Sequence, residues 1–593
     1  MKKIFVSIFV MLFAFTSCKK DVLDKVPLDI ISDAAVWNDP VLIDAYLNQV
    51  YSEMYIFTND GDTKSGYQEG MWFSMFNANE LSDEAKANWV DDSYRYKFGN
   101  LRVEGGLFEW WPYNTIRKLN EFIQRVPESP IDDALKARRV AEARFLRAFA
   151  YFGMVKRYGG VPLITVVQNL TDPEDVLYPK RDKEEDVYNF IIAEIDAITN
   201  DLPQTITGND LGRPSSYAAM ALQCRAALYA GSIAKYGTVK INGVVGIDAS
   251  KADGFYQKAY DVAQTIISSG AFSLYNADAD KSTNYRNLFL VKNNSEVIFA
   301  KRHNNLDPRT GGAGWGYDFF QSPAPQAWGA GNQDAPYLEM VEEYEYTDGT
   351  SGKFNRDDLQ QGLHTTEELF GNKDPRFKAT IYTQNTPWKG RELQFYKGII
   401  DESGNIINGG SYNGVLSQGG AYFAQVGSNT GFGVLKYLDE TSNADFNWGT
   451  SSQDYIVFRY GEVLLNYAEA AFELNKSADA LNAVNQIRDR AGIKILTAIT
   501  REQIRHERKV ELAFEGHRYW DLRRWRQAVT ELSKQNSGLQ YILDFTTKKF
   551  KLLVINQVDG TVALPAFYEQ NYYLPITIVR TANNPNLVEN PGY

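Results

Sequence analysis

The chain of 593 residues carries 62 Lys and Arg against 74 Asp and Glu, a net charge of −12, and 13% of its residues are aromatic. No basic block stands out, and nucleic-acid binding requires clustered positive charge against the phosphate backbone, so we expect no nucleic-acid partner. A chain of this length buries a large core and needs no disulfide for stability.

The N-terminus has the charged, apolar and small-residue order of a secretory signal. After Met-Lys-Lys comes an apolar run of twelve residues, Ile4 to Phe15, followed by Thr16, Ser17 and Cys18. The run is shorter than the roughly 20 residues that a membrane-spanning helix needs. We predict a lipoprotein signal peptide over residues 1–17 and acyl chains on Cys18 that anchor the protein to a membrane. The alternative is ordinary secretion, with Cys18 left as a free thiol.

Two stretches, about 40–275 and 455–530, carry apolar residues at helical spacing and predict a helical scaffold. Within them, helices are expected to pair near residues 139–205, 216–270 and 458–492. The pairs resemble those of tetratricopeptide (TPR) proteins, but their spacing is too irregular for a solenoid with a repeat of about 34 residues. Cys224 lies in an apolar run of the second pair, and we expect it to be a buried small hydrophobe.

Two loop-rich insertions interrupt this scaffold, at about 55–115 and 276–455. The second is rich in Gly, Asn, Pro, Ser and aromatic residues and contains only short strand-like pieces, such as Val297 to Ala300. The predicted fold is therefore mainly α, with TPR-like helix pairs as scaffold and a large loop-rich portion with few short strands.

The sequence contains no motif for catalysis or for a cofactor. Four histidines occur without an HExxH pattern, and neither a CxxC nor a GxSxG motif is present. Asn276, Asp278 and Asp280 resemble the start of a calcium loop, but the glycine and glutamate that such a loop requires are missing, so a solvated loop is expected. We predict no catalytic residue, no cofactor and no metal site, although sequence alone cannot identify a paired-carboxylate glycosidase site.

The segment 507–525 interleaves apolar and charged residues and allows two interpretations. The charges form either a catalytic cluster or structural ion pairs that lock helices together. We favour structural ion pairs, because such networks also perturb titratable groups and are commoner than active sites.

Five blocks of the sequence resemble the SusD/RagB family of outer-membrane nutrient-binding lipoproteins. They are KVPLD (25–29), EARFLRAFAYFGMVKRYGGVPLI (142–164), RYGEVLLNYAEAAFELN (459–475), ERKVELAFEGHRYWDLRRW (507–525) and NPNLVENPGY (584–593). They follow one another in the order of the family. The segment 574–580, LPITIVR, departs from the family pattern because it lacks a second proline and an acidic residue, which puts a surface contact in question.

The resemblance implies a single SusD-like unit over residues 18–593, tethered through Cys18 to the outer face of the outer membrane of a Bacteroidetes-type bacterium. It also implies a binding protein that captures glycan and delivers it to a SusC-like TonB-dependent transporter. The alternatives are a RagB-like peptide-binding uptake protein and, less favoured, a glycoside hydrolase.

Aromatic side chains in the two insertions are the candidate ligand-binding residues. Sugar rings present apolar C–H faces that lie flat on aromatic rings, while polar neighbours bond to the hydroxyl groups. The alternative for each ring is a place in the core, because Trp and Tyr are often largely buried. The candidates are Trp72, Trp89, Tyr94, Trp315, Tyr317 and Trp328.

Overall fold

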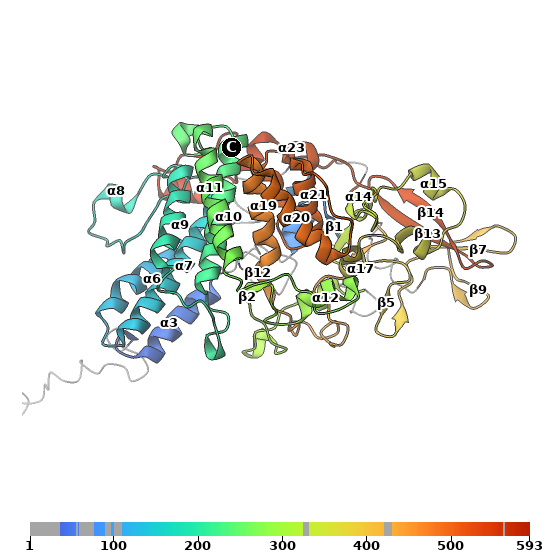
Figure 1. Cartoon of the computed structure of the whole chain (residues 1–593), viewed down its shortest axis with the longest axis horizontal. Helices are drawn as coiled ribbons and strands as arrows, with labels where there is room; N and C mark the ends of the chain where they lie inside the picture. Colours follow the sequence, from blue (N-terminus) through green and yellow to red (C-terminus); the bar gives the residue numbers. More distant parts are fainter. Residues whose placement is uncertain are drawn as a thin grey trace, which may run out of the picture.

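The computed structural model describes residues 36–54, 57, 76–88, 96–99, 109–323, 331–419, 430–560 and 564–593. The predicted signal peptide over residues 1–17 and the predicted lipidation site Cys18 lie outside these residues. Figure 1 shows the long helices in one half of the molecule and the strands of the β13–β14 sheet at the opposite end.

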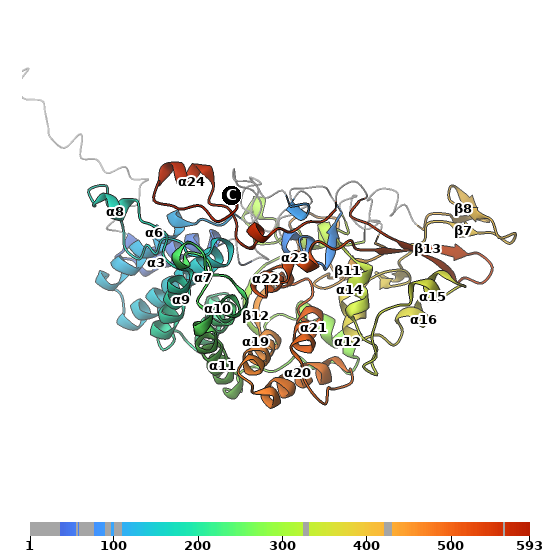
Figure 2. The same cartoon turned by 90° about the horizontal axis from the view of Figure 1, so that it is seen from above.

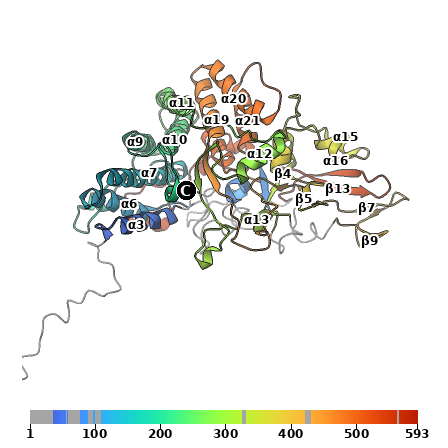
Figure 3. The ribbon, with the colours of Figure 1, turned by 60° about the horizontal axis from the view of Figure 1, so that its bottom comes forward.

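The long helices form one continuous array in which each helix contacts the next (Figure 1). Figure 3 shows the array as an arc, from α3 at one end to α20. Its members are α3 (Pro40–Ser52), α6 (Tyr113–Arg125), α7 (Asp133–Tyr158), α9 (Glu184–Ile198), α10 (Ser216–Tyr236), α11 (Ala252–Ser268), α19 (Tyr460–Glu473), α20 (Ser477–Ala491) and α21 (Arg501–Glu511).

The three helix pairs predicted from the sequence are confirmed as α7 with α9, α10 with α11, and α19 with α20. Only residues 474–476 connect α19 to α20, and such a short connection makes two helices neighbours. The mainly α fold with paired helices is therefore the architecture of the chain.

Helix α7 shows how the sequence sets the helix bounds. The Asp132 side chain accepts a hydrogen bond from the backbone N–H of Leu135 at 3.1 Å, which satisfies one of the free donors of the first turn. The helix ends at Gly159, whose φ of +76° lies in the region that favours glycine. Its apolar stripe is buried in the core: Phe145, Phe149, Phe152 and Val155.

Small residues allow α10 to approach α11 closely. A Cβ atom on Gly231 would lie 3.0 Å from the ring of Tyr256, tighter than most real contacts. Cys224 on the same helix is fully buried, as predicted, and its thiol lies 3.4 Å from the carbonyl oxygen of Ala259. Burial raises the pKa of the Cys224 thiol to about 12, so it stays protonated and unreactive.

The loop-rich part is inserted between two helices that pack on each other. Helix α11 ends at Ser268 and α19 begins at Tyr460, yet the two helices are in contact. The insertion carries several short helices, which are α12 (Lys281–Leu290), α13 (Tyr317–Gln321), α14 (Leu338–Glu343), α15 (Arg356–Gln360), α16 (Thr366–Phe370) and α17 (Pro375–Thr380).

All strands of the described residues are short, from two to seven residues, as predicted. Residues from the insertion and from the C-terminal part share one four-stranded sheet in the order β14-β13-β7-β8. Its strands are β7 (Ile399–Ile400), β8 (Ile406–Ile407), β13 (Gly538–Asp544) and β14 (Phe550–Ile555). Two-stranded pairs join β1 (Ala85–Ala87) with β3 (Asp334–Pro336), β2 (Val297–Lys301) with β12 (Tyr455–Arg459), β4 (Ile381–Tyr382) with β11 (Gly433–Val434), β5 (Pro387–Trp388) with β6 (Arg391–Glu392), and β9 (Ser411–Tyr412) with β10 (Val415–Leu416).

The last residues of the chain lie against the end of α7. The amide Nδ2 of Asn590 donates to the carbonyl oxygens of Tyr158 at 3.0 Å and Leu574 at 2.7 Å. The segment that departs from the family pattern ends in α24 (Ile578–Asn583), which Figure 2 shows at the same edge of the molecule as α8 (Glu174–Leu177). Ile578 and Val579 are exposed there, so the departure affects the surface. The remaining short helices are α4 (Asn77–Glu80), α22 (Arg518–Arg524) and α23 (Ala528–Glu531).

Candidate functional site

A short β-ladder brings together the two insertions that the sequence singled out. Strands β1 and β3 pair antiparallel, with Ala85 opposite Pro336 and Ala87 opposite Asp334. The ladder continues through the backbone N–H of Asn88, which donates to the carbonyl oxygen of Gln333 at 2.9 Å. Residues about 250 positions apart in sequence therefore lie side by side, and we call this place the insertion junction.

Hydrogen bonds between buried side chains next to β1 and β3 stabilise the insertion junction. Asn79 Nδ2 donates to Asp334 Oδ2 at 2.8 Å, and Gln333 Nε2 donates to Glu80 Oε1 at 2.7 Å. The backbone N–H of Asp334 donates to Gln321 Oε1 at 2.9 Å. Networks of this kind hold their members in one geometry because a buried polar group without a partner is costly.

Carboxyl groups under the insertion junction have raised pKa values. Burial, with a smaller effect of Asp83, raises the pKa of Glu84 to about 7. Burial also raises the pKa of Asp318 to about 6 and that of Asp334 well above its usual range. A buried carboxyl group loses the hydration of its charged form, so burial favours the protonated form of each of these groups.

Two of the six candidate aromatics are core residues, which corrects the prediction of solvent-facing rings at Trp315 and Tyr317. Their exposed fractions are 1% and 6%. Trp315 stacks between the rings of His303 at 4.7 Å and Tyr317 at 4.8 Å. The physical reason is local: Trp315 and Ser451 exchange two backbone hydrogen bonds, which ties this segment to the interior.

The other four candidates, Trp72, Trp89, Tyr94 and Trp328, lie outside the described residues and stay predictions. In the sequence, Trp89 directly follows the last residue of the insertion junction, and Trp328 precedes Gly331 by three positions. Asn88 Nδ2 donates to the Gly331 carbonyl oxygen at 3.3 Å. The described residues nearest in sequence to Trp89 and Trp328 are thus in contact with each other.

Three glutamates of the charged segment 507–525, Glu507, Glu511 and Glu515, belong to a buried assembly that we call the central ion-pair network. Its side chains are at most 3% exposed, and its five cations and five anions balance. The members are Glu296, Asp374, Arg376, Lys436, Arg459, Arg488, Arg490, Glu507, Glu511 and Glu515.

At the centre of this network, Glu511 contacts three guanidinium groups. Arg459 Nη1 lies 2.7 Å from Glu511 Oε1 and Arg376 Nη1 lies 2.8 Å from Oε2, while Arg490 contacts Oε1 as well. Burial alone would raise the pKa of Glu511, but these three arginines hold it well below its usual range. Charges that neutralise one another this closely support the structural interpretation of segment 507–525.

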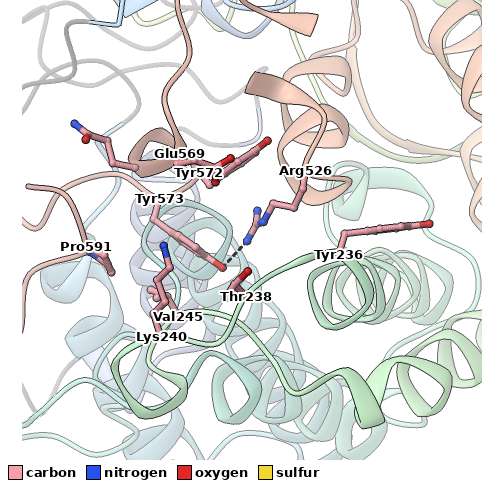
Figure 4. A pocket seen from close by; sticks show the side chains of 10 residues that line it. Tyr236, Thr238, Lys240, Val245, Arg526, Glu569, Tyr572, Tyr573 and Pro591 are labelled. Atoms are coloured by element: carbon pink, nitrogen blue, oxygen red, sulfur yellow. Dashed lines mark hydrogen bonds between the residues drawn. The ribbon is translucent and has the colours of Figure 1, made fainter. Parts of the chain in front are cut away.

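Figure 4 shows a small pocket between the end of α10, the residues after α22 and the C-terminal segment. Its volume is about 200 Å³. Arg526, with a left-handed φ of +57°, donates from Nη2 to the Tyr573 hydroxyl at 2.8 Å, and its guanidinium lies 4.6 Å from the centre of the Tyr572 ring. Tyr573 in turn donates to Glu184 Oε2 at 2.7 Å. The pocket is smaller than the roughly 300–1,000 Å³ of ordinary ligand sites, so it can take only a small group.

A larger cleft of about 520 Å³ runs along β2, and we call it the edge cleft. One wall comes from residues 204–217, before and at the start of α10, and the other from residues 293–302. The sequence predicted a strand at Val297 to Ala300 but gave no sign of the cleft. Only the spatial arrangement of α10, α11 and β2 creates it.

The described residues offer no candidate metal site. They contain no group of three or more His, Cys, Asp or Glu side chains placed to hold a metal ion. The segment that resembles a calcium loop is instead a helix start, because Asp280 accepts a hydrogen bond from the backbone N–H of Thr283 at the beginning of α12. No helix within the described ranges is long and apolar enough to cross a membrane.

The described residues form an array of paired helices that is interrupted by a loop-rich insertion. Two family profiles match the chain: one described as SusD family over residues 295–593, and one described as starch-binding associating with outer membrane over residues 23–228. The chain belongs to the SusD family.

Curated relatives match along the whole chain. The starch-binding protein SusD of Bacteroides thetaiotaomicron is 23% identical, with 98% of this chain and 96% of the relative covered. The SusD-like protein P2 of Formosa agariphila is also 23% identical and is matched over 100% of both chains.

Solved structures share the fold. A SusD-like protein from Bacteroides fragilis superposes with a TM-score of 0.72 at 24% identity, covering 96% of this chain and 100% of that one. A laminarin-binding SusD-like protein gives a TM-score of 0.59 at 22% identity, covering 94% of this chain and 100% of that one. These TM-scores show that the chain shares its fold with the two solved structures.

Proposed function

We propose that this protein binds glycan at the cell surface through aromatic side chains of the two insertions. The observation that supports the proposal is the insertion junction, where Asn88 and Gly331, the described residues nearest in sequence to Trp89 and Trp328, lie beside each other. Two aromatic segments that start from one rigid point can act together on one oligosaccharide. Large aromatic surfaces supply affinity, and polar neighbours supply selectivity.

The relatives agree with carbohydrate as the ligand. The protein from Bacteroides thetaiotaomicron is named as starch-binding, and one structural neighbour is named as laminarin-binding. The family description of association with the outer membrane fits a lipid anchor on Cys18. In this arrangement the protein captures glycan outside the cell and delivers it to a SusC-like TonB-dependent transporter.

Isothermal titration calorimetry and affinity electrophoresis against starch, laminarin and a panel of other oligosaccharides test the proposal. We expect saturable binding to at least one glycan and at least a tenfold loss in the variants Trp89→Ala and Trp328→Ala. The matched control is Tyr178→Ala, which removes an exposed aromatic ring of the scaffold outside both insertions. Absence of binding to every glycan, or equal losses in all three variants, would contradict the proposal.

Capture and delivery require no covalent chemistry. We therefore expect no new reducing ends or smaller products when the purified protein is incubated with any glycan that it binds. The appearance of product would instead support the hydrolase alternative. Co-purification of a SusC-like transporter with this protein from detergent-solubilised outer membranes tests the delivery step. The absence of any such transporter from the purified sample would contradict it.

A further inference from the structure

The edge cleft has a wall made by one strand that lacks a second neighbour. Strand β2 pairs with β12 along one edge, and no strand of the described chain lies along its other edge. About half of the backbone N–H and C=O groups of such an edge strand point away from its partner. They are available to hydrogen-bond with another extended chain.

The contacts of the cleft show that it follows this edge. It is lined by four consecutive residues of β2, from Val297 to Ala300. Side chains alternate between the two faces of a strand, so a cleft on one face would be lined by every second residue only. Four residues of a strand extend about 13 Å, enough for four or five residues of an added peptide.

The opposite wall supplies apolar surface for the side chains of an added strand. Tyr217 and Phe272 form an edge-to-face pair at 5.3 Å, and Leu211 at the cleft is 39% exposed. The volume of about 520 Å³ lies within the range of roughly 300–1,000 Å³ for ordinary ligand sites.

The polar groups of the cleft favour an occupant with acceptor groups. Two arginines, Arg213 and Arg302, line it, and none of its described lining residues is Asp or Glu. Their ion-pair partners lie outside the lining: Arg213 contacts Glu142 at 2.8 Å and Arg302 contacts Asp454 at 3.3 Å. A basic segment would find no carboxylate in the cleft, whereas carbonyl oxygens and acidic side chains would meet guanidinium donors.

We propose that the edge cleft binds an extended, neutral or acidic polypeptide segment that adds to β2 as a third strand. Main-chain hydrogen bonds to the edge give the binding energy, and the apolar wall selects the side chains. This activity is separate from glycan binding at the insertion junction and does not depend on it.

The test uses the full-length protein in detergent and a fluorescent pentapeptide, acetyl-Thr-Val-Thr-Val-Asp-amide, whose β-branched residues favour the extended form. Binding is measured by fluorescence anisotropy. The matched probe has the same sequence with N-methyl groups on alternate amides, which removes the donors needed for strand addition. We expect saturable binding of the first probe, at least tenfold weaker binding of the second, and reduced hydrogen exchange of residues 297–300 in the complex.

Two tryptophan variants of one loop provide the control within the protein. Thr205 is exposed and lines the cleft, so the indole of Thr205→Trp should fill the cleft and weaken binding of the first probe at least tenfold. Thr207 is exposed on the same loop but does not line the cleft, so Thr207→Trp should bind as the wild type does. Gln204→Trp, a second filling variant, repeats the test if Thr205→Trp fails to fold.

Three results would overturn the proposal. They are the absence of saturable peptide binding, equal binding of the N-methylated probe, and loss of starch or laminarin binding in Thr205→Trp with peptide binding intact. The last result would make the cleft a carbohydrate site. Retained glycan binding with no peptide binding refutes this proposal alone and leaves the proposed function standing.

Discussion

Glu511→Gln is the substitution that most directly tests the central ion-pair network. The change keeps the size of the side chain and removes one negative charge. Three buried guanidinium groups, those of Arg376, Arg459 and Arg490, then lose their common partner. Each arginine keeps one other carboxylate, because Arg376 contacts Glu507, Arg459 contacts Glu515 and Arg490 contacts Glu296. The buried network nevertheless holds one positive charge more than it has negative charges.

The expected effect is large for a single isosteric change. Removing one partner of a buried ion pair costs about 3–5 kcal/mol, because it leaves an uncompensated buried charge. The entropy of unfolding is about 2.1 cal/mol/K per residue, or about 1.2 kcal/mol/K for a chain of this length. If the chain unfolds in one step, the melting temperature should fall by about 2.5–4 °C.

Urea titration at pH 7 measures the free energy of unfolding, and differential scanning calorimetry measures the melting temperature. The control is Glu531→Gln, which removes a partly exposed carboxylate paired with the exposed Lys534. Exposed pairs of this kind contribute about 0–1 kcal/mol, so the control should unfold almost as the wild type does.

A stabilised Glu511→Gln variant would refute the structural interpretation. Active sites hold like charges and strain that lower stability, so removing a catalytic group commonly makes a protein more stable. A gain in stability would therefore point to the catalytic cluster that the sequence also allowed.

Three further outcomes follow from burial and exposure. Trp315→Ala should lower the free energy of unfolding by about 3–5 kcal/mol in urea titrations, because its ring is buried. From the proposed role of Trp328 in a binding segment, we expect Trp328→Ala to weaken glycan binding and to change the free energy of unfolding by less than about 0.5 kcal/mol; equal destabilisation by the two changes would contradict this role. The pKa of Glu84 is raised to about 7 in the folded protein. Protonation of Glu84 therefore stabilises the fold fully below the usual pKa of glutamate, and this stabilisation is lost as the pH rises through 7. The difference in unfolding free energy between wild type and Glu84→Gln should fall by about 2 kcal/mol from pH 5 to pH 8, and a difference independent of pH would exclude this titration. In a Cys18→Ser variant, Cys224 should react with a thiol reagent only after denaturation, because its thiol is buried; rapid reaction in the native protein would show that α10 opens.

The helix pairs could be predicted because their signal is local. Apolar spacing along α7, α10 and α19 repeats within one helix, and caps such as Asp132 and Gly159 stand next to the ends that they fix. The family blocks lie on the same helices, so pattern and resemblance indicated one architecture.

The insertion junction and the edge cleft could not be predicted, because both depend on contacts between distant segments. Asn79 and Asp334 are 255 residues apart, and neither has a neighbour in sequence that indicates the other. Trp315 shows the same limit. Its glycine-rich surroundings indicated an exposed loop, but the hydrogen bonds with Ser451 direct the ring into the core.

The contact between α11 and α19 has a consequence for how this architecture diversifies. Residues 269–459 leave the array and return to it at a single place, so the array is continuous in space although it is interrupted in sequence. The entropic penalty of closing such an excursion grows only by about 0.6 kcal/mol for each doubling of its length. Lengthening or shortening of its loops, with the residues of the central ion-pair network kept, would therefore leave the packing of the long helices nearly unaffected. Ligand preference can change through this region while the frame that carries it stays the same.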